Sequence, residues 1–281
     1  MNTHHTAFPP LYVSHGSPMT ALEPGAAGAF WQRLGPALQA RFGTPKAILA
    51  VSAHSLTREP VLLGAARHEA VYDFGGFPDA LYQLRYDVDG APALAQRVAG
   101  LLRDAGLPIH LSPEGGLDHG IWTPLRSMFP GANVPVLPLA WPPGWAPERL
   151  QALGAALAPL AAEGVLILGS GSITHNLRLF AAGRGEIDQP EYPESAAFRQ
   201  WFQQHTEAGD HAQLATWRTQ APHAVHMHPT DEHLLPFFVA AGAGGLSHPG
   251  LRLHESVTYG HLGMDAYAFG PGAAELQAAL A

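Results

Sequence analysis

Short, almost unbroken hydrophobic runs alternate along the chain with longer segments of helical pattern. In these runs apolar residues follow one another instead of alternating with polar ones, which is typical of parallel strands covered by helices on both faces. Four strands are predicted on this basis, at residues 11–13, 47–51, 134–139 and 165–168. The segments between them are amphipathic or rich in alanine and predict helices at residues 26–42, 91–105 and 146–163.

The alternation of strand and helix predicts an α/β fold with a central, mostly parallel sheet flanked by helices on both faces. This periodic part ends near Ala182. Beyond it, the pattern predicts helices at residues 194–208 and 231–241 and strands at residues 251–257 and 265–269. No internal repeat and no linker rich in glycine, serine or charge divides the chain. We therefore expect residues 1–281 to form a single domain.

Composition narrows the possible chemistry. The 281 residues are 47% hydrophobic and 14% charged, which excludes a disordered chain. The net charge of −8 offers no electrostatic attraction to nucleic acid or to an anionic membrane surface. The chain has no cysteine, so disulfides, thiolate catalysis and cysteine-ligated metal sites are excluded. Because cysteine is absent, any metal must be held by histidine or carboxylate. Histidine is abundant, since 17 histidines outnumber the 15 lysines and arginines.

The sequence has no clear targeting or membrane-spanning segment. Residues 1–5 lack the basic segment and apolar run of a secretory signal, and we expect His4 and His5 to lie in a disordered terminus. The most apolar stretch, residues 150–169, is interrupted by polar residues and proline, and residues 234–246 are too few to span a bilayer. A cytoplasmic protein without membrane contact is therefore expected.

Three of the predicted strands lead directly into short segments that contain a histidine. These segments are Ser14-His15-Gly16-Ser17-Pro18, Ser52-Ala53-His54 and Gly169 to His175. The carboxyl ends of parallel strands meet at one edge of a sheet, and ligands of open α/β sheets bind there. A single histidine after a strand is most often a loop or core residue, whereas three together favour a metal or substrate site. The small neighbouring residues would let a ligand approach closely.

Two further histidines belong to the same hypothesis. His119 lies between glycines, just before a predicted helix. His233 is predicted in the first turn of the 231–241 helix, with Thr230 as its N-cap. Asp231 and Glu232 are common residue types in a first turn, where they offset the helix dipole. The positive end of that helix would keep His233 neutral, as a metal ligand requires.

Three other motifs give weaker indications of function. Gly169-Ser170-Gly171-Ser172 matches neither a phosphate-binding loop nor the serine nucleophile of hydrolases. The tract His223 to His228 is interpreted as an exposed loop or pocket rim, not as a metal site. The segment Tyr72 to Pro78 is interpreted, from composition alone, as a turn with hydrophobic anchors.

Taken together, these segments resemble the class III extradiol ring-cleavage dioxygenases, in particular the 4,5-DOPA dioxygenase-like branch. Six motifs occur in the family order between residues 15 and 236. They are His15-Gly16-Ser17-Pro18, Ser52-Ala53-His54, Asp73-Phe74-Gly75-Gly76-Phe77-Pro78, Asp118-His119-Gly120, Thr174-His175-Asn176-Leu177 and Pro229 to Pro236. The resemblance implies a non-haem Fe(II) enzyme that uses O₂, and no organic cofactor, to open a catechol ring beside its two hydroxyls.

The resemblance also implies roles for individual residues. His15, His54 and His233 correspond to the metal ligands. His175 corresponds to the active-site base, near enough to the metal to be counted as a fourth ligand in some forms. His119 corresponds to a second acid/base or substrate-orienting residue. An isolated sample could carry Zn(II) in the same ligands, because affinity alone does not select iron.

The chain departs from related enzymes at two positions. Many ring-cleaving dioxygenases use two histidines and one carboxylate, and here Glu232 adjoins His233. Consecutive helical residues point about 100° apart, so only one of the two can serve, and the branch pattern favours His233. Tyr72 stands where many relatives have histidine, which bears on the substrate. The resemblance places the Phe74 to Pro78 loop at the pocket wall.

Two other functions remain open at this level. A zinc hydrolase could use the same histidines, with Glu232 or Asp118 activating water, and would work without oxygen. A non-catalytic metal-binding protein would have exposed ligand clusters and no substrate-shaped pocket.

The sequence leaves the catechol itself undetermined, and oligomeric state and regiospecificity as well. Four arginines are candidates for binding a substrate carboxylate, although a surface position is the simpler explanation for each. They are Arg58, Arg85, Arg126 and Arg178.

Overall fold

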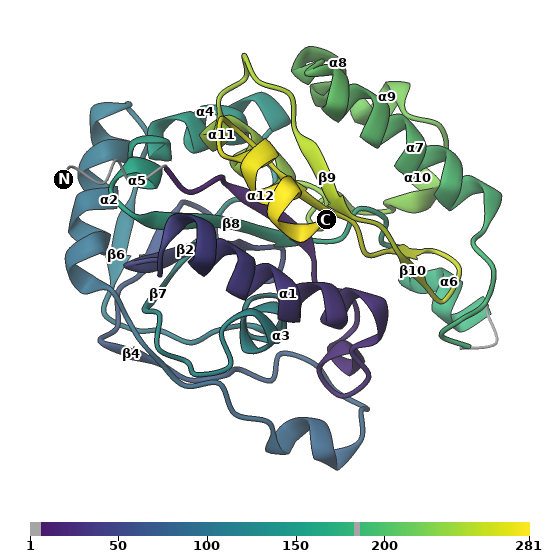
Figure 1. Ribbon diagram of the computed structural model, residues 1–281, viewed down its shortest axis with the longest axis horizontal. Coiled ribbons are helices and arrows are strands. Elements are labelled where there is room, and N and C mark those ends of the chain that lie inside the picture. The colour runs from purple at the N-terminus through teal and green to yellow at the C-terminus, as the bar shows by residue number, and fades with distance from the viewer. Residues whose placement is uncertain (1–6, 183–185) are drawn as a thin grey trace.

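An eight-stranded sheet runs through the centre of the protein (Figure 1). The computed structural model describes residues 7–182 and 186–281, so His4 and His5 lie outside the described residues. The spatial order of the strands is β6-β3-β7-β2-β8-β1-β12-β9. Their bounds are β1 (Leu11–Ser14), β2 (Ala47–Ser52), β3 (Val61–Leu63), β6 (His110–Ser112), β7 (Val136–Ala140), β8 (Val165–Gly171), β9 (Leu251–His254) and β12 (Ala266–Ala268).

The sheet is mostly parallel, as predicted. Its four central strands, β7, β2, β8 and β1, all run in the same direction, and β3 is parallel to β6. The pairs β3–β7, β1–β12 and β12–β9 are antiparallel. Two short ribbons lie apart from the sheet, formed by β4 (Arg67–His68) with β5 (Val88–Asp89) and by β10 (Val257–Thr258) with β11 (Leu262–Gly263).

Helices cover both faces of the sheet. One face packs against α1 (Gly25–Phe42), α3 (His119–Met128) and α12 (Ala273–Leu280). The other packs against α2 (Pro92–Asp104), α4 (Pro147–Leu157), α7 (Pro193–Ala208) and α11 (Pro236–Gly244). The shorter helices are η1 (Pro18–Ala21), η2 (Asp79–Gln83), α5 (Pro159–Ala162), α6 (Leu177–Ala182), α8 (His211–Ala215), α9 (Trp217–Gln220) and α10 (Ala224–Met227). Helices α7 to α10 gather at the upper right of Figure 1.

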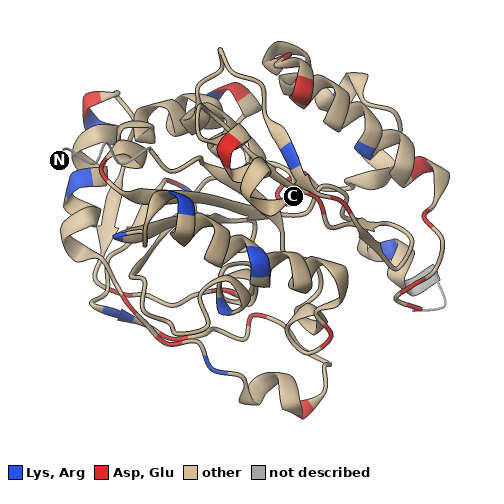
Figure 2. Cartoon of the chain, viewed as in Figure 1, with Lys and Arg blue, Asp and Glu red and all other residues tan. Residues whose placement is uncertain are grey.

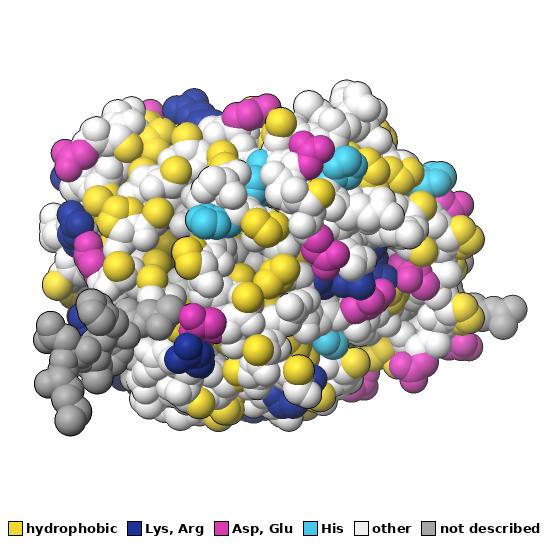
Figure 3. Space-filling view, turned by 45° about the horizontal axis from the view of Figure 1, so that its top comes forward, with side chains coloured by type: hydrophobic (Ala, Val, Ile, Leu, Met, Phe, Trp, Pro, Cys, Tyr) yellow, Lys and Arg dark blue, Asp and Glu magenta, His cyan; other side chains and the backbone are white. Residues whose placement is uncertain are grey.

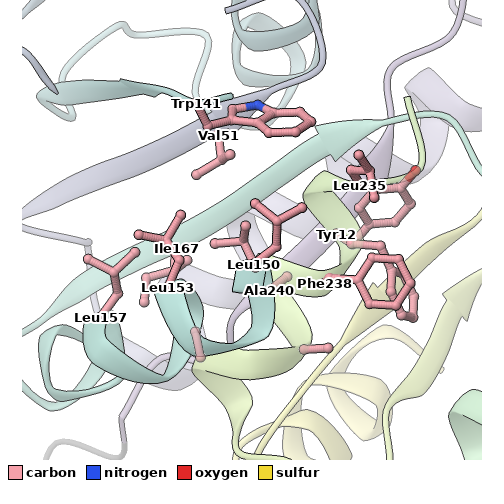
Figure 4. Close-up of a cluster of buried hydrophobic side chains, with 14 of the residues drawn as sticks. Tyr12, Val51, Trp141, Leu150, Leu153, Leu157, Ile167, Leu235, Phe238 and Ala240 are labelled. Atoms are coloured by element: carbon pink, nitrogen blue, oxygen red, sulfur yellow. The ribbon is translucent and has the colours of Figure 1, made fainter. Parts of the chain in front are cut away.

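Each central strand contributes to two hydrophobic cores. In β2, Leu49 and Val51 enter the core below α4 and α11, whereas Ile48 and Ala50 enter the core below α1 and α3. Figure 4 shows the first of these cores, where Leu153 of α4 and Phe238 of α11 lie beside strand residues. Because successive side chains of a strand point to opposite faces, both faces require apolar residues. This explains the unbroken hydrophobic runs of the sequence.

Two predicted helices differ from the structure, and proline accounts for both differences. The predicted helix 146–163 is divided into α4 and α5, with Pro159 as the first residue of α5. The predicted helix 231–241 begins only at Pro236, after a turn at residues 232–235. Proline lacks the backbone N–H and is favoured at the first position of a helix, so each proline starts a new helix.

Charged residues are sparse on this fold. Figure 2 shows the few lysines and arginines scattered over separate elements. On the face shown in Figure 3, hydrophobic side chains are dispersed among polar ones and do not form one large patch. Within the described residues, no helix has both the length and the apolar character that crossing a bilayer demands.

Candidate metal centre

Strand ends bring three histidines to one edge of the sheet, as the sequence predicts. β2, β8 and β1 are adjacent and parallel, and Ser14 of β1 lies beside Gly171 of β8. His15 follows β1 directly, His54 follows β2 after one residue, and His175 lies four residues beyond β8. The parallel register therefore places all three at the carboxyl edge of the sheet.

The Nε2 atoms of three histidines converge at this edge. His54 Nε2 lies 3.1 Å from His15 Nε2 and 3.3 Å from His233 Nε2. His15 and His233 are buried, and His54 is half-buried. Metal–imidazole bonds of about 2.0–2.1 Å in tetrahedral geometry place ligand nitrogens about 3.3 Å apart. The three rings are therefore spaced as metal ligands are.

The opposite ring nitrogens of these histidines each face an oxygen atom. His15 Nδ1 lies 3.0 Å from Ser170 Oγ, whose own hydroxyl donates to a backbone oxygen. His233 Nδ1 lies 3.1 Å from Glu232 Oε1, and His54 Nδ1 lies 3.5 Å from Asp73 Oδ2. An acceptor at Nδ1 fixes the proton there, so each Nε2 presents a lone pair. Three lone pairs facing one another repel unless a cation lies between them, so this set fits a divalent metal.

Burial keeps these histidines neutral. Burial and the neighbouring histidines lower the pKa of His15 and of His233 well below the usual range. Burial also lowers the pKa of His54 to about 4, against the opposing pull of the Asp73 carboxylate. Since only neutral imidazole binds a metal, the site is ready for one at neutral pH.

His233 is placed differently from the prediction. It lies in the turn before α11, not in a first helical turn, and Thr230 caps no helix there. The Tyr12 hydroxyl donates to the backbone oxygen of His233 at 3.1 Å, and the Ser172 N–H donates to the same oxygen at 2.8 Å. His233 is therefore held against β1 and β8, and it is neutral because it is buried, not because of a helix dipole.

Glu232 also has a different place from the one expected. Glu232 and His233 lie in a turn and not in a helix, so the divergence of about 100° expected for consecutive helical residues does not apply to them. Its Oε1 accepts a hydrogen bond from the Thr230 hydroxyl at 3.0 Å as well as facing His233 Nδ1. Glu232 thus orients the imidazole that adjoins it.

His175 and His119 flank the three converging rings. The His175 ring stacks on the His233 ring, with centroids 3.5 Å apart. Burial, reinforced by nearby histidines, lowers the pKa of His175 to about 2. The His119 ring centroid lies 4.1 Å from that of His54. Both His175 and His119 line the same cavity as the converging rings.

Asp73 is a site residue whose importance the sequence alone did not indicate. The backbone N–H and Nδ1 of His119 both donate to its Oδ1, at 2.9 and 3.0 Å, while its Oδ2 faces His54. Burial raises the pKa of Asp73, but the hydrogen bonds and charge of His119 outweigh it, so the net pKa is lowered. The one sequence feature that could have indicated its role is its position in the Asp73-Phe74-Gly75-Gly76 segment. From composition alone, that segment was interpreted only as a turn.

Asp118 ties the end of β2 to the start of α3. Its carboxylate accepts hydrogen bonds from Ser52 Oγ at 2.7 Å and Ser55 Oγ at 2.5 Å, on either side of His54. Burial raises its pKa. Because Asp118 directly precedes His119 and bonds both serines around His54, it fixes the spacing of these two histidines. Asp118 itself does not line the cavity.

A largely apolar cavity of about 560 Å³ opens onto the histidines. Phe74 and Phe77 line it, as the resemblance implied for their loop. Its full lining is Gly16, Ser17, Pro18, Met19, His54, Asp73, Phe74, Phe77, His119, His175, Leu177, Phe180, Glu232, His233, Tyr259 and Leu262. The cavity is thus large enough for an aromatic ring beside the converging histidines.

The His223 to His228 tract differs in part from its interpretation as an exposed loop. It includes the short helix α10, and His228 is fully buried, with Nε2 donating to the Ile173 backbone oxygen at 3.0 Å. His223 and His226 are exposed. None of the three lines the cavity.

Comparisons with known proteins agree with this geometry. The family model described as "Catalytic LigB subunit of aromatic ring-opening dioxygenase" matches residues 6–270. The chain is 35% identical over 261 residues to a 4,5-DOPA dioxygenase extradiol of Beta vulgaris, covering 92% of this chain and 95% of that protein. It is 34% identical over 277 residues to the protein of that name from Escherichia coli, covering 92% and 93%.

The fold has a solved counterpart as well. The crystal structure of an uncharacterized protein from Escherichia coli K12 superposes with a TM-score of 0.76 and 29% sequence identity. The match covers 94% of this chain and 100% of that one.

Proposed function

The chain belongs to the family of LigB catalytic subunits of aromatic ring-opening dioxygenases and is an extradiol ring-cleaving dioxygenase. On this basis, we propose that it is an Fe(II) enzyme that acts on a catechol. The ring bond beside the two hydroxyls would be broken and both atoms of O₂ incorporated. The product would be of the muconic semialdehyde type. We further propose that residues 1–281 act as one catalytic domain, since the site draws on residues from 15 to 233.

The proposed metal ligands are His15, His54 and His233. The convergence of their Nε2 atoms, with Nδ1 of His15 and of His233 each paired with an oxygen, is the observation that carries this assignment. Three neutral ligands suit Fe(II), and they suit Zn(II) equally, so isolated protein can carry either. A bound Fe(II) would supply adjacent positions for the catechol oxygens and O₂, and would pass electron density between them.

The proposed catalytic residues are His175 and His119. His175 lies on the cavity wall, stacked against His233, and this position beside the proposed ligands supports its role in accepting the proton of a catechol hydroxyl bound there. His119 donates through Nδ1 to Asp73, which leaves the lone pair of its Nε2 available to accept a hydrogen bond or a proton from substrate, and a proton taken up there can later be returned. The apolar side chains that line the cavity around both residues would shield part of the bound ring from bulk water.

A zinc hydrolase on the same histidines is not favoured. It needs a carboxylate free to activate water. Glu232 is engaged with His233 Nδ1 and with Thr230, and Asp118 is buried under two serine hydroxyls away from the cavity.

The decisive experiment compares two metal forms of one preparation. Protein reconstituted anaerobically with Fe(II) is mixed with a catechol panel and O₂, and oxygen uptake and visible absorbance are recorded beside a Zn(II)-loaded control. Oxygen uptake with a new yellow product in the iron form alone supports the proposal. Metal-loaded protein that consumes no oxygen with any catechol refutes it.

A further inference from the structure

We propose that the substrate is a catechol whose ring substituent is uncharged and apolar, and that the cavity discriminates against catechols carrying a carboxylate. This inference rests on the proposed function and concerns the part of the cavity beyond the histidines. It follows from the charge and chemistry of the residues that line the cavity.

Apolar side chains make up most of the cavity lining other than the histidines and the two carboxylates. Phe74 and Phe77 contribute one aromatic wall, with ring centroids 5.4 Å apart. Phe180 of α6 and Tyr259 contribute another, with centroids 4.8 Å apart. Pro18, Met19, Leu177 and Leu262 complete the apolar lining. A substituent that extends from a bound ring therefore meets hydrocarbon and aromatic surface.

The positive charge of a bound divalent metal is already balanced by carboxylates at the cavity, before any charge on a substrate substituent is added. The carboxylates of Asp73 and Glu232 line the cavity, and among the described residues no lysine or arginine does so. A divalent metal on three neutral histidines is offset by these two carboxylates. Because ionised catechol adds negative charge, a carboxylate on its substituent would face surplus negative charge and no cation.

The arginines considered as carboxylate partners from the sequence lie elsewhere. Arg85 and Arg126 line a separate hollow of about 830 Å³ together with Arg67. Arg58 lines a third hollow beside Trp145. Arg178, although it is in α6, is exposed and is not among the cavity residues. None of the four candidates is thus placed to pair with a substrate carboxylate.

The cost of an unpaired buried charge sets the size of the discrimination. A substrate that lacks one methylene in an apolar site loses about 10- to 200-fold in kcat/KM. A buried charged group that finds no partner in the site is discriminated against more strongly. The cavity is partly open to solvent, so we expect a preference of about 10- to 100-fold for the apolar substituent.

A matched substrate pair tests this preference. One catechol carries a propyl group and the other a propionate group at the same ring position, so that they differ by a methyl group against a carboxylate. We expect kcat/KM on the iron form to favour the propyl compound at least about 10-fold, chiefly through KM. Anaerobic Kd values on the Zn(II) form should show the same order. Equal values, or a preference for the propionate, would overturn the inference while leaving ring cleavage intact. Cleavage of neither compound nor any other catechol would instead refute the proposed function.

Engineered charges provide a second test. Leu177 lines the cavity and is 64% exposed, so Leu177→Arg adds a cation at its rim without disturbing the core. The ratio of kcat/KM values should shift toward the propionate about 10-fold. Val225→Arg is the control, because Val225 is 63% exposed but lies outside the cavity, and the ratio should not move. A shift in both variants would show a net-charge effect and overturn the inference.

Arg184 needs its own variant, since residues 183–185 follow α6 but lie outside the described residues. The substrate ratio of Arg184→Ala should equal that of the unmodified protein. A wild-type preference for the propionate that disappears in this variant would overturn the inference and identify the cation responsible.

Discussion

The imidazole rings of His175 and His233 lie parallel, with planes 6° apart and centroids 3.5 Å apart. His233 directs its Nε2 toward His54, at 3.3 Å, and the stacked ring of His175 covers one face of this imidazole. The backbone N–H of His175 is held separately, by a bond to the Met227 oxygen at 3.0 Å. Ring contact and backbone therefore position His175 without requiring a bond to the metal.

The first prediction separates base from ligand at His175. His175→Phe retains a stacking ring and removes both nitrogens, so metal content should stay near that of the unmodified protein. Ring cleavage should fall by about 10²- to 10⁴-fold, the usual contribution of a general base. Metal analysis and oxygen uptake are measured on the same sample, with the exposed His226→Phe as control. Purification of His175→Phe without metal would make His175 a ligand.

The second prediction concerns Asp73, which contacts both His119 and His54. In Asp73→Ala the His119 ring loses its Nδ1 acceptor and the His54 ring loses the carboxylate that faces its Nδ1 at 3.5 Å, so metal affinity should fall by about 10- to 100-fold. Competition with a chelator measures this affinity. Asp79→Ala removes the exposed carboxylate of the first residue of η2, which lies outside the cavity, and the metal affinity of this variant should be unchanged. Equal affinities in the two variants would contradict the orienting role of Asp73.

The third prediction uses the close packing between β8 and the turn that holds His233. A methyl group at Gly171 would collide with the backbone oxygen of His233. Gly171→Ala should therefore displace a proposed ligand, lower stability by about 1–3 kcal/mol and weaken metal binding. Gly144 has no neighbour near such a methyl group, so Gly144→Ala should unfold like the unmodified protein. Chemical denaturation and metal titration of both variants check this.

The fourth prediction concerns stability in acid. Burial lowers the pKa of His228 to about 4, below the value of about 6.5 in the unfolded chain. The unfolded state therefore binds a proton first, and stability is lost as pH falls from about 6.5 toward 4. Near pH 5.5 this histidine alone should cost about 1.4 kcal/mol relative to neutral pH.

Replacement of His228 should remove this part of the acid sensitivity. Urea denaturation at neutral pH and near pH 5.5 should show a smaller difference in His228→Gln than in the unmodified protein. His226→Gln, which changes an exposed histidine two residues away, should retain the full difference. An unchanged difference in His228→Gln would assign the acid sensitivity to other groups.

Much of the fold could be predicted because the signals that specify it are local. The runs at residues 47–51 and 165–168 are apolar at every position, which only a strand buried on both faces requires. The same reasoning placed His15, His54 and His175 at one edge, because parallel strands share their direction. The boundaries at Pro159 and Pro236 were missed because apolar periodicity continues through them.

The parts of the site that escaped prediction depend on contacts between distant segments. The Asp73 carboxylate meets His119 across 46 positions of sequence, and Asp118 meets Ser52 across 66. No local pattern records such a contact, and the residue types are ordinary for turns and helix starts. Likewise, His228 is buried through its packing against Phe198 and Trp217, which its own histidine-rich tract does not indicate.

The dispersal of the three converging histidines along the chain sets an order of events during synthesis. His15 and His54 are 39 positions apart, whereas His233 follows His54 by 179 positions. A nascent chain on the ribosome therefore offers only two of the three imidazoles until residue 233 has emerged. β1 also waits for its partner β12 near the carboxyl terminus. A metal would thus find all three imidazoles only after the central strands β1, β2, β7 and β8 have been synthesised.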